Sequence, residues 1–290
     1  MRDDVEFVLV RPSHPGNIGA AARAIATMGF RRLCVVAPRF DDALEHPQAR
    51  AFASGATDLL AQTRIVDDLS RAIADAHWVV GFSAETREFA AAVRPPRAMA
   101  AEVVARLAAA PPVDAVSAAS VAVVFGTERT GLSIAEAQLC QRICSIETDP
   151  GHTSLNLAQA VQLAAYVLRE AFVCAFDPGA AFGPAAPTPV GDGVGAARWS
   201  ADPAPTDGGV DGSPASREPG DRPATSAQLE GLYGHLESML VEIGFLDLAR
   251  PKRLMPRLRN LFGRSRPSVT EVDILRGICT RILEDRDRAR

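Results

Sequence analysis

The sequence lacks the clusters of cysteine and histidine that hold metals or stabilise secreted domains. Its five cysteines are spread over 290 residues without a CxxC pair, and its five histidines show no ligand spacing with one another or with the cysteines. Metal sites and disulfide frameworks both need such clusters. We therefore expect reduced cysteines, no bound metal and a cytoplasmic location.

Excess basic charge and long apolar runs are also missing. The formal net charge is -4, so any binding of nucleic acid must come from a local basic patch. The first residues, MRDDVEFVLV, are acidic where a signal peptide is basic. No stretch is apolar for long enough to cross a bilayer, so we expect no membrane partner.

What the sequence does contain is an alternation of buried strands and helices. Short apolar or β-branched runs predict strands at 5–10, 33–37, 77–82, 121–125 and 142–147. Helical patterns cover 20–28, 41–60, 67–76, 98–109 and a long apolar segment after Asn156. This order is typical of an α/β domain with a mostly parallel sheet flanked by helices.

The composition changes sharply after residue 176. Residues 177–225 contain nine Gly and nine Pro, too many breakers to bury a core, which predicts a disordered linker. Apolar residues at helical spacing return after it. We therefore expect an α/β domain at 1–176, the linker at 177–225 and a small helical domain at 226–290.

Two loops that follow predicted strands present polar residues. In the first, Asn17 is placed to cap an alanine-rich helix. That helix carries Arg23, which lies on a solvated face, forms an ion pair between domains, or binds an anion. In the second, glycines bracket Glu128 and Arg129, and Ser133 can form a capping box with Glu136 three residues on. The second loop is neither a P-loop nor a dinucleotide fingerprint.

A third loop, at 152–157, places four polar residues before the long apolar helix. Asn156 can cap that helix, but capping alone explains only one of the four. The helix carries a narrow polar stripe, which is either a solvated edge or a subunit interface: Gln159, Gln162, Tyr166 and Arg169.

The carboxyl-terminal part carries a basic run at 250–266 without an acidic residue. Its seven basic residues in a chain of negative net charge favour a footprint for a phosphate backbone over a solvated face. Four of them are candidate RNA contacts: Lys252, Arg253, Arg257 and Arg259.

Taken together, three blocks resemble the motifs of the SpoU/TrmH-type methyltransferases of the SPOUT superfamily. They read RPSHPGNIGAAARAIATMGF, VVFGTERTGLS and IETDPGHTSLNLAQAV, in the family's order and spacing. The carboxyl-terminal extension makes the chain similar to the tRNA 2′-O-methyltransferases of that family.

The resemblance implies a SPOUT α/β knot, a deep trefoil knot in a mostly parallel sheet, with a small all-helical domain behind it. It also implies a homodimer and S-adenosyl-L-methionine as the cofactor. The residues that match the family's cofactor loops are Phe82, Ser83, Ala84, Gly126, Thr127, Ile146, Thr153, Ser154 and Leu155.

The implied activity is transfer of a methyl group to a ribose 2′-hydroxyl of tRNA, at a cytidine or uridine in position 32 of the anticodon loop. The catalytic set that maps onto this chain is Arg23, Asn17, Glu128, Ser154 and Asn156. Arginine is always protonated, so we expect Arg23 to hold a phosphate and stabilise the developing alkoxide, with Arg129 as a further RNA contact. Alternatives are another RNA, such as ribosomal RNA or another tRNA position, and a non-catalytic RNA-binding dimer.

Overall fold

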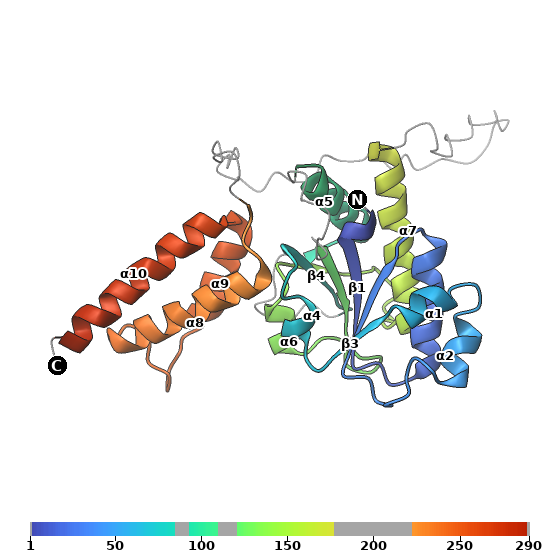
Figure 1. The fold of residues 1–290 in the computed structure, drawn as a ribbon, viewed down its shortest axis with the longest axis horizontal. Helices are drawn as coiled ribbons and strands as arrows, with labels where there is room; N and C mark the ends of the chain where they lie inside the picture. The colour runs from blue at the N-terminus through green and yellow to red at the C-terminus, as the bar shows by residue number, and fades with distance from the viewer. Residues whose placement is uncertain (1, 85–92, 110–120, 177–221, 289–290) are drawn as a thin grey trace.

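The computed structural model describes residues 2–84, 93–109, 121–176 and 222–288 (Figure 1). The strands are β1 (Val5–Val10), β2 (Arg32–Val36), β3 (Arg64–Val66), β4 (Trp78–Phe82), β5 (Val93–Arg94), β6 (Val121–Phe125) and β7 (Arg142–Cys144). The helices of the sheet domain are the 3-10 turn Arg2–Asp4, α1 (Pro15–Thr27), α2 (Pro47–Phe52), α3 (Thr57–Ala61), α4 (Leu69–Ala72), α5 (Pro96–Ala109), α6 (Ile134–Gln138) and α7 (Leu157–Phe176). The carboxyl-terminal helices are α8 (Ser226–Glu242), α9 (Leu254–Ser265) and α10 (Val269–Arg288).

The strands form one sheet in the order β3-β2-β1-β6-β4-β7-β5, and every pairing is parallel. This confirms the predicted parallel sheet. All six residues of β1 are buried, as expected for a strand covered on both faces. Phe7 and Leu9 face the layer of α1, α5 and α7, whereas Val8 and Val10 face the layer of α4 and α6.

Some predicted elements have different bounds in the structure. The helix expected at 41–60 is two short helices, because Pro47 opens α2 and the chain turns at Gly55, whose φ is +80°. The strand expected at 142–147 stops at Cys144, where its pairing with β4 ends. The predicted linker, up to residue 221, lies outside the described residues.

The helix α7 corrects the expectation about apolar runs. In the part of the chain that the structure describes, it is the one helix long and apolar enough to cross a membrane. Length and composition do not separate such a helix from the core helix of an α/β domain. Here Val161, Ala164 and Leu168 are fully buried against the sheet, so α7 packs as a core helix.

The carboxyl-terminal helices build a second, smaller core. Leu229, Leu232 and Tyr233 of α8 pack against Val272 of α10, and a capping box between Ser268 and Glu271 opens α10. Figure 1 shows these helices beside the face of the sheet that carries α4 and α6. The contact is direct, since the backbone N–H of Ser226 donates to the carbonyl of Ala76 at 2.8 Å.

Candidate active site at the edge of the sheet

The polar loops after β1 and β6 meet at the point where the connections leave the sheet toward opposite faces. β1 and β6 are neighbours with the same direction, so the loops that follow them leave the same edge. The loop after β1 leads to α1 on one face, whereas the loop after β6 leads to α6 on the opposite face. Such a switch point leaves a crevice at the carboxyl ends of the strands, where open α/β sheets bind ligands.

A chain of hydrogen bonds crosses this crevice and joins the three blocks. The Glu128 carboxylate accepts the backbone N–H of Ser13, at 3.0 and 3.1 Å to its two oxygens, and the Asn17 side-chain amide at 3.0 Å. The Asn17 oxygen in turn accepts the Asn156 side-chain amide at 3.0 Å. Residues more than 100 positions apart in sequence are thus fixed as one unit.

Both asparagines also reveal how the flanking helices begin. Asn156 accepts the backbone N–H of Ala158 at 2.9 Å, which confirms that it caps α7. The prediction that Asn17 caps α1 is wrong, because the helix begins at Pro15. Asn17 therefore lies in the first turn, and its side chain is available to bridge Glu128 and Asn156.

The environment of Glu128 favours its ionised form. Partial burial by itself would raise the pKa of this carboxyl, but the hydrogen bonds from Asn17 and Ser13 outweigh the burial and leave the pKa below its usual value. A carboxylate whose lone pairs are occupied in this way is a fixed anchor for its neighbours.

A cavity of about 320 Å³ opens beside this network. Its lining includes all nine residues that the resemblance assigned to the cofactor: Phe82, Ser83, Ala84, Gly126, Thr127, Ile146, Thr153, Ser154 and Leu155. Glu128 and Arg129 also line it. Its size and its mixture of aromatic walls with a few polar groups are usual for a small-molecule site.

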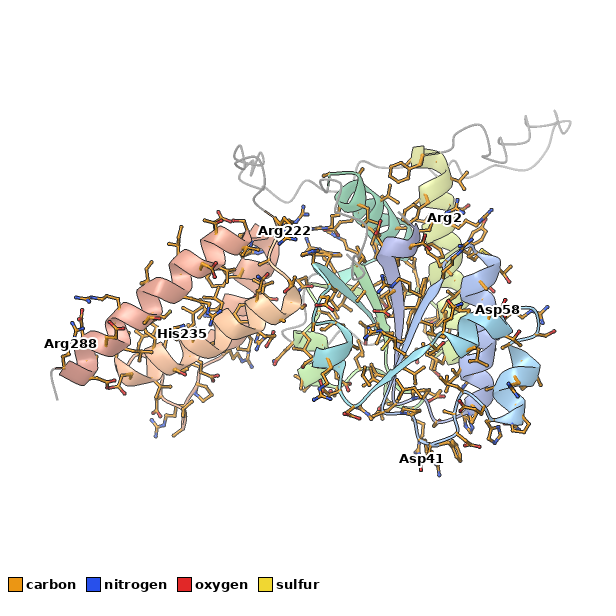
Figure 2. All side chains as sticks on the ribbon, viewed as in Figure 1. Arg2, Asp41, Asp58, Arg222, His235 and Arg288 are labelled. Atoms are coloured by element: carbon orange, nitrogen blue, oxygen red, sulfur yellow. The ribbon has the colours of Figure 1, made fainter. Side chains whose placement is uncertain are left out.

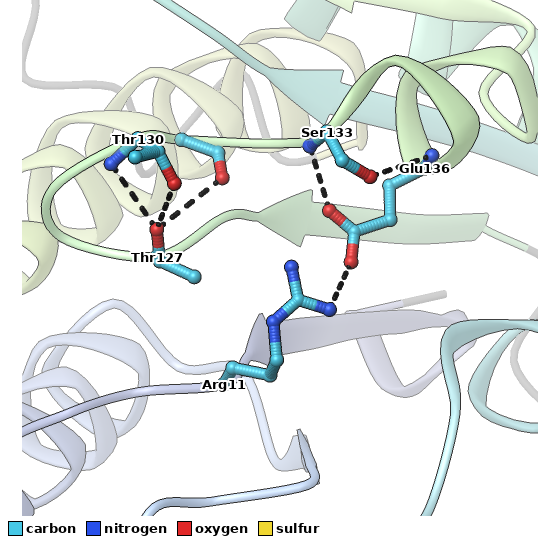
Figure 3. A network of polar contacts seen from close by, with 6 residues as sticks. Arg11, Thr127, Thr130, Ser133 and Glu136 are labelled. Carbon is cyan, nitrogen blue, oxygen red and sulfur yellow. Dashed lines mark hydrogen bonds and ion pairs between the residues drawn. The ribbon is translucent and has the colours of Figure 1, made fainter.

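The turn at one wall of the cavity is closed tightly. Thr127 and Gly131 exchange backbone hydrogen bonds at 3.0 and 3.1 Å, and the hydroxyls of Thr127 and Thr130 are 2.8 Å apart (Figure 3). A Cβ on Gly126 would lie 2.0 Å from the carbonyl carbon of Gly131. Only glycine fits at this position without moving the turn.

An ion pair that sequence reasoning missed ties the loop after β1 to α6, the helix that follows the second loop (Figure 3). Arg11 donates to the Glu136 carboxylate at 2.5 Å, and the same carboxylate accepts the backbone N–H of Ser133 at 2.7 Å in the predicted capping box, which is confirmed. Burial would raise the pKa of Glu136, but these hydrogen bonds lower it below its usual value. The one sequence signal for Arg11 was a charge at the end of a buried strand.

Three residues predicted to act on the substrate are exposed. Arg23 lies on α1, Arg129 on the second loop and Ser154 on the third. The side chain of Arg23 makes no hydrogen bond or ion pair with any residue that the structure describes. The interpretation of Arg23 as half of an ion pair between domains is therefore wrong for the described residues, and a solvated face or an external anion remains.

The predicted RNA contacts of the carboxyl-terminal domain divide into two groups. Lys252, Arg253 and Arg257 are exposed. Arg259 is three-quarters buried, pairs through both of its terminal nitrogens with Glu230, and lies 4.5 Å from the ring centre of Tyr233. Arg259 therefore also holds α9 on α8, and its contact with RNA stays a prediction.

Comparisons with known proteins agree with this architecture. The SpoU rRNA methylase family matches residues 4–166, and the carboxyl-terminal domain of the tRNA methyltransferase TrmJ matches residues 227–290. The chain belongs to the SpoU methylase family, and its fold is the SPOUT α/β knot with a small all-helical carboxyl-terminal domain.

Individual relatives are similar over both domains. The chain is 38% identical to the tRNA (cytidine/uridine/adenosine-2′-O-)-methyltransferase TrmJ of Pseudomonas aeruginosa, covering 97% of this chain and 94% of the relative. It is 36% identical to the tRNA (cytidine/uridine-2′-O-)-methyltransferase TrmJ of Salmonella typhimurium, covering 97% of each. The crystal structure of TrmJ from Z. mobilis superposes with a TM-score of 0.68 at 27% identity, covering 96% of this chain and 98% of that one.

Proposed function

We propose that this protein is an S-adenosyl-L-methionine-dependent methyltransferase that modifies a ribose 2′-hydroxyl of tRNA. The observation that carries the proposal is the joining of Asn17, Glu128 and Asn156 beside a cavity of suitable size. The relatives named for this activity support it, because they match both the sheet domain and the helical extension. Within tRNA we propose a cytidine or uridine at position 32 of the anticodon loop, as the resemblance implied.

The cavity fits the proposed cofactor. Phe82, Phe125 and Ile146 supply apolar walls for an adenine ring, and Thr127, Ser83 and Ser154 supply polar groups around them. When bound, S-adenosyl-L-methionine supplies a methyl group on a sulfonium. The tight turn after Gly126 keeps the wall of this cavity in a fixed shape before any ligand arrives.

The chain's own residues would place and activate the hydroxyl. Arg23 cannot serve as a base because it is always protonated, so its role is to hold the phosphate next to the target ribose and stabilise the developing negative charge. Glu128 keeps Asn17 in place, and Asn17 aligns Asn156. Much of the rate enhancement then comes from holding the two reactants in line.

We also propose that the protein acts as a cytoplasmic homodimer. The outward face of α7 carries Leu163 and Tyr166, which are 42% and 45% exposed. Phe52 of α2, which is 56% exposed, lines a cavity together with residues of α7. Apolar side chains that gather on one face favour a protein interface. The polar stripe predicted on α7 is only partly available for a subunit interface, because Arg169 donates to the carbonyl of Met28 in its own chain at 3.2 Å.

The test is methyl transfer by an Arg23→Ala variant. We expect loss of transfer to unmodified tRNA, with equilibrium binding of S-adenosyl-L-methionine and the dimer mass unchanged, since the Arg23 side chain makes no hydrogen bond or ion pair with a described residue. Arg31→Ala is the matched control, because Arg31 is an exposed arginine just beyond the same helix. Full activity of Arg23→Ala would refute the assigned role.

A further inference from the structure

The two domains enclose a second cavity between them. Its volume is about 480 Å³, and its walls come from residues 138–142 of the sheet domain and from α8 and α9 of the helical domain. Figures 1 and 2 show the helical domain beside this side of the sheet domain, with Arg222 where the two meet. Hydrogen bonds from Ser226 to Ala76 and from Ala227 to Ala74, at 2.8 and 3.1 Å, hold the contact together.

A glycine brings the helix α9 close to the sheet domain at this cavity. Gly263 is buried, and a Cβ built on it would lie 3.6 Å from Cγ of Gln141. A larger side chain there would enter the space between the domains. The cavity therefore depends on both domains and on their close approach.

The charges that line this cavity are mostly positive. Arg142 comes from the sheet domain, and Arg257, Arg259 and Arg264 come from α9, whereas Glu230 is the one acidic residue in the lining. Glu230 is already paired with Arg259. The side chains of Arg257 and Arg264 make no hydrogen bond or ion pair with any residue in the described part of the chain.

The sheet domain adds further positive charge behind the wall of the cavity. Arg142 and Arg106 share one carboxylate, Glu102, at 3.3 and 2.6 Å. Arg106 and Arg142 also lie over the ring of Trp78, at 3.3 and 5.3 Å. Burial, together with the positive charges of Arg266 and Arg142, lowers the pKa of Arg106 to about 10. Positive charge is thus concentrated at the contact between the domains, and it would be relieved by an anion.

We propose that this interdomain cavity receives a phosphate of the RNA backbone, held by Arg257 and Arg264 of α9 together with Arg142 of the sheet domain. Guanidinium groups suit phosphate because they offer paired N–H donors in one plane. Polar side chains in the same lining, Gln138 and Asn260, can donate to the sugar or to phosphate oxygens. The inference rests on the proposed function, since it takes tRNA as the substrate. It predicts that RNA binding stabilises one arrangement of the two domains.

The first experiment removes the two unpaired charges from the full-length protein. Arg257→Gln with Arg264→Gln should weaken binding to unmodified tRNA by about tenfold or more near 0.1 M salt and make the slope of log K against log salt shallower by about 1.5. The control, Arg276→Gln with Arg281→Gln, removes the same charge from exposed positions on α10 outside the cavity. An unchanged slope, or equal effects in both double variants, would overturn the proposal.

The second experiment fills the cavity without changing any charge. Gly263→Leu places a side chain between α9 and Gln141, so it should weaken tRNA binding by a similar factor if the site needs both domains. Normal binding by this variant would overturn the composite site. Circular dichroism would check that its helical content is unchanged.

Two further readouts separate the possible failures. Cytidine monophosphate and inorganic phosphate test for a small-ligand site, and tight binding of either without competition by tRNA would overturn the proposal. Methyl transfer at saturating tRNA tests the proposed function alone. A wild-type protein that neither binds nor methylates tRNA would refute that function. If the wild-type protein binds and methylates tRNA, and if the Arg257→Gln/Arg264→Gln and Gly263→Leu variants bind tRNA as tightly as the wild type, only the interdomain phosphate site would be refuted.

Discussion

The substitution Glu128→Gln tests the network at the switch point most sharply. It keeps the shape of the side chain but removes the charge that the backbone of Ser13 and the amide of Asn17 stabilise. Hydrogen bonds to a charged acceptor contribute roughly 1.5–3 kcal/mol each. The glutamine retains one acceptor oxygen, so we expect a loss of about 2 kcal/mol in the free energy of unfolding at pH 7.

The measurement is urea unfolding followed by circular dichroism, with Glu147→Gln as the matched control. Glu147 is exposed and makes no hydrogen bond or ion pair with any described residue, so its variant should have the wild-type midpoint. The midpoint of Glu128→Gln should fall with an unchanged slope. Equal midpoints for the two variants would refute the argument.

The free energy of unfolding of the wild type should also depend on pH differently from that of Glu128→Gln, and the sign of the difference follows from the pKa of Glu128. The folded pKa of Glu128 lies below its usual value, so the ionised carboxylate stabilises the native state above the unfolded pKa of about 4.3. That stabilisation is lost as the pH falls through the lowered folded value. The advantage of the wild type over Glu128→Gln should therefore be constant near neutrality and shrink below about pH 4. An advantage that grows on acidification would contradict the assignment.

Three further predictions follow from other contacts. Arg11→Gln should cost about 0.5–1 kcal/mol in urea unfolding, since the guanidinium is half exposed although Glu136 is buried; an unchanged midpoint would count against the ion pair. Gly126→Ala should abolish binding of S-adenosyl-L-methionine in an equilibrium titration, because its Cβ would overlap the facing backbone, and normal binding would show that the turn adapts. Burial raises the pKa of Cys140 and of Cys144 to about 12, so both should resist iodoacetamide at pH 8 in the native protein and react after unfolding, as mass spectrometry would detect.

Local patterns in the sequence were sufficient for the centre of the fold. The runs at 5–10 and 121–125 are apolar and rich in valine, interrupted only by Glu6, and they form β1 and β6 with those bounds. Because both strands end in polar, glycine-containing loops, the crevice between them could be located before the structure was known. The capping box at Ser133 was also visible, since it depends on residues three positions apart.

Contacts between distant segments could not be derived in the same way. Arg11 and Glu136 are 125 positions apart, and no local pattern pairs them. The prediction that Asn17 precedes α1 as its cap was wrong because Pro15 starts this helix earlier than the alanine run suggested. The positive charges at the contact between the domains come from Arg142 of the sheet domain and from α9. The sequence shows the basic run of α9, but it does not show which part of the sheet domain lies opposite that run.

The most direct test of the account is transfer of a radiolabelled methyl group from S-adenosyl-L-methionine to unmodified tRNA, followed by nuclease digestion and separation of the nucleosides. We expect label in 2′-O-methylated cytidine or uridine, none with Arg23→Ala, and wild-type levels with Arg31→Ala. Label on a base, or no transfer to any tRNA by the wild-type protein, would contradict it.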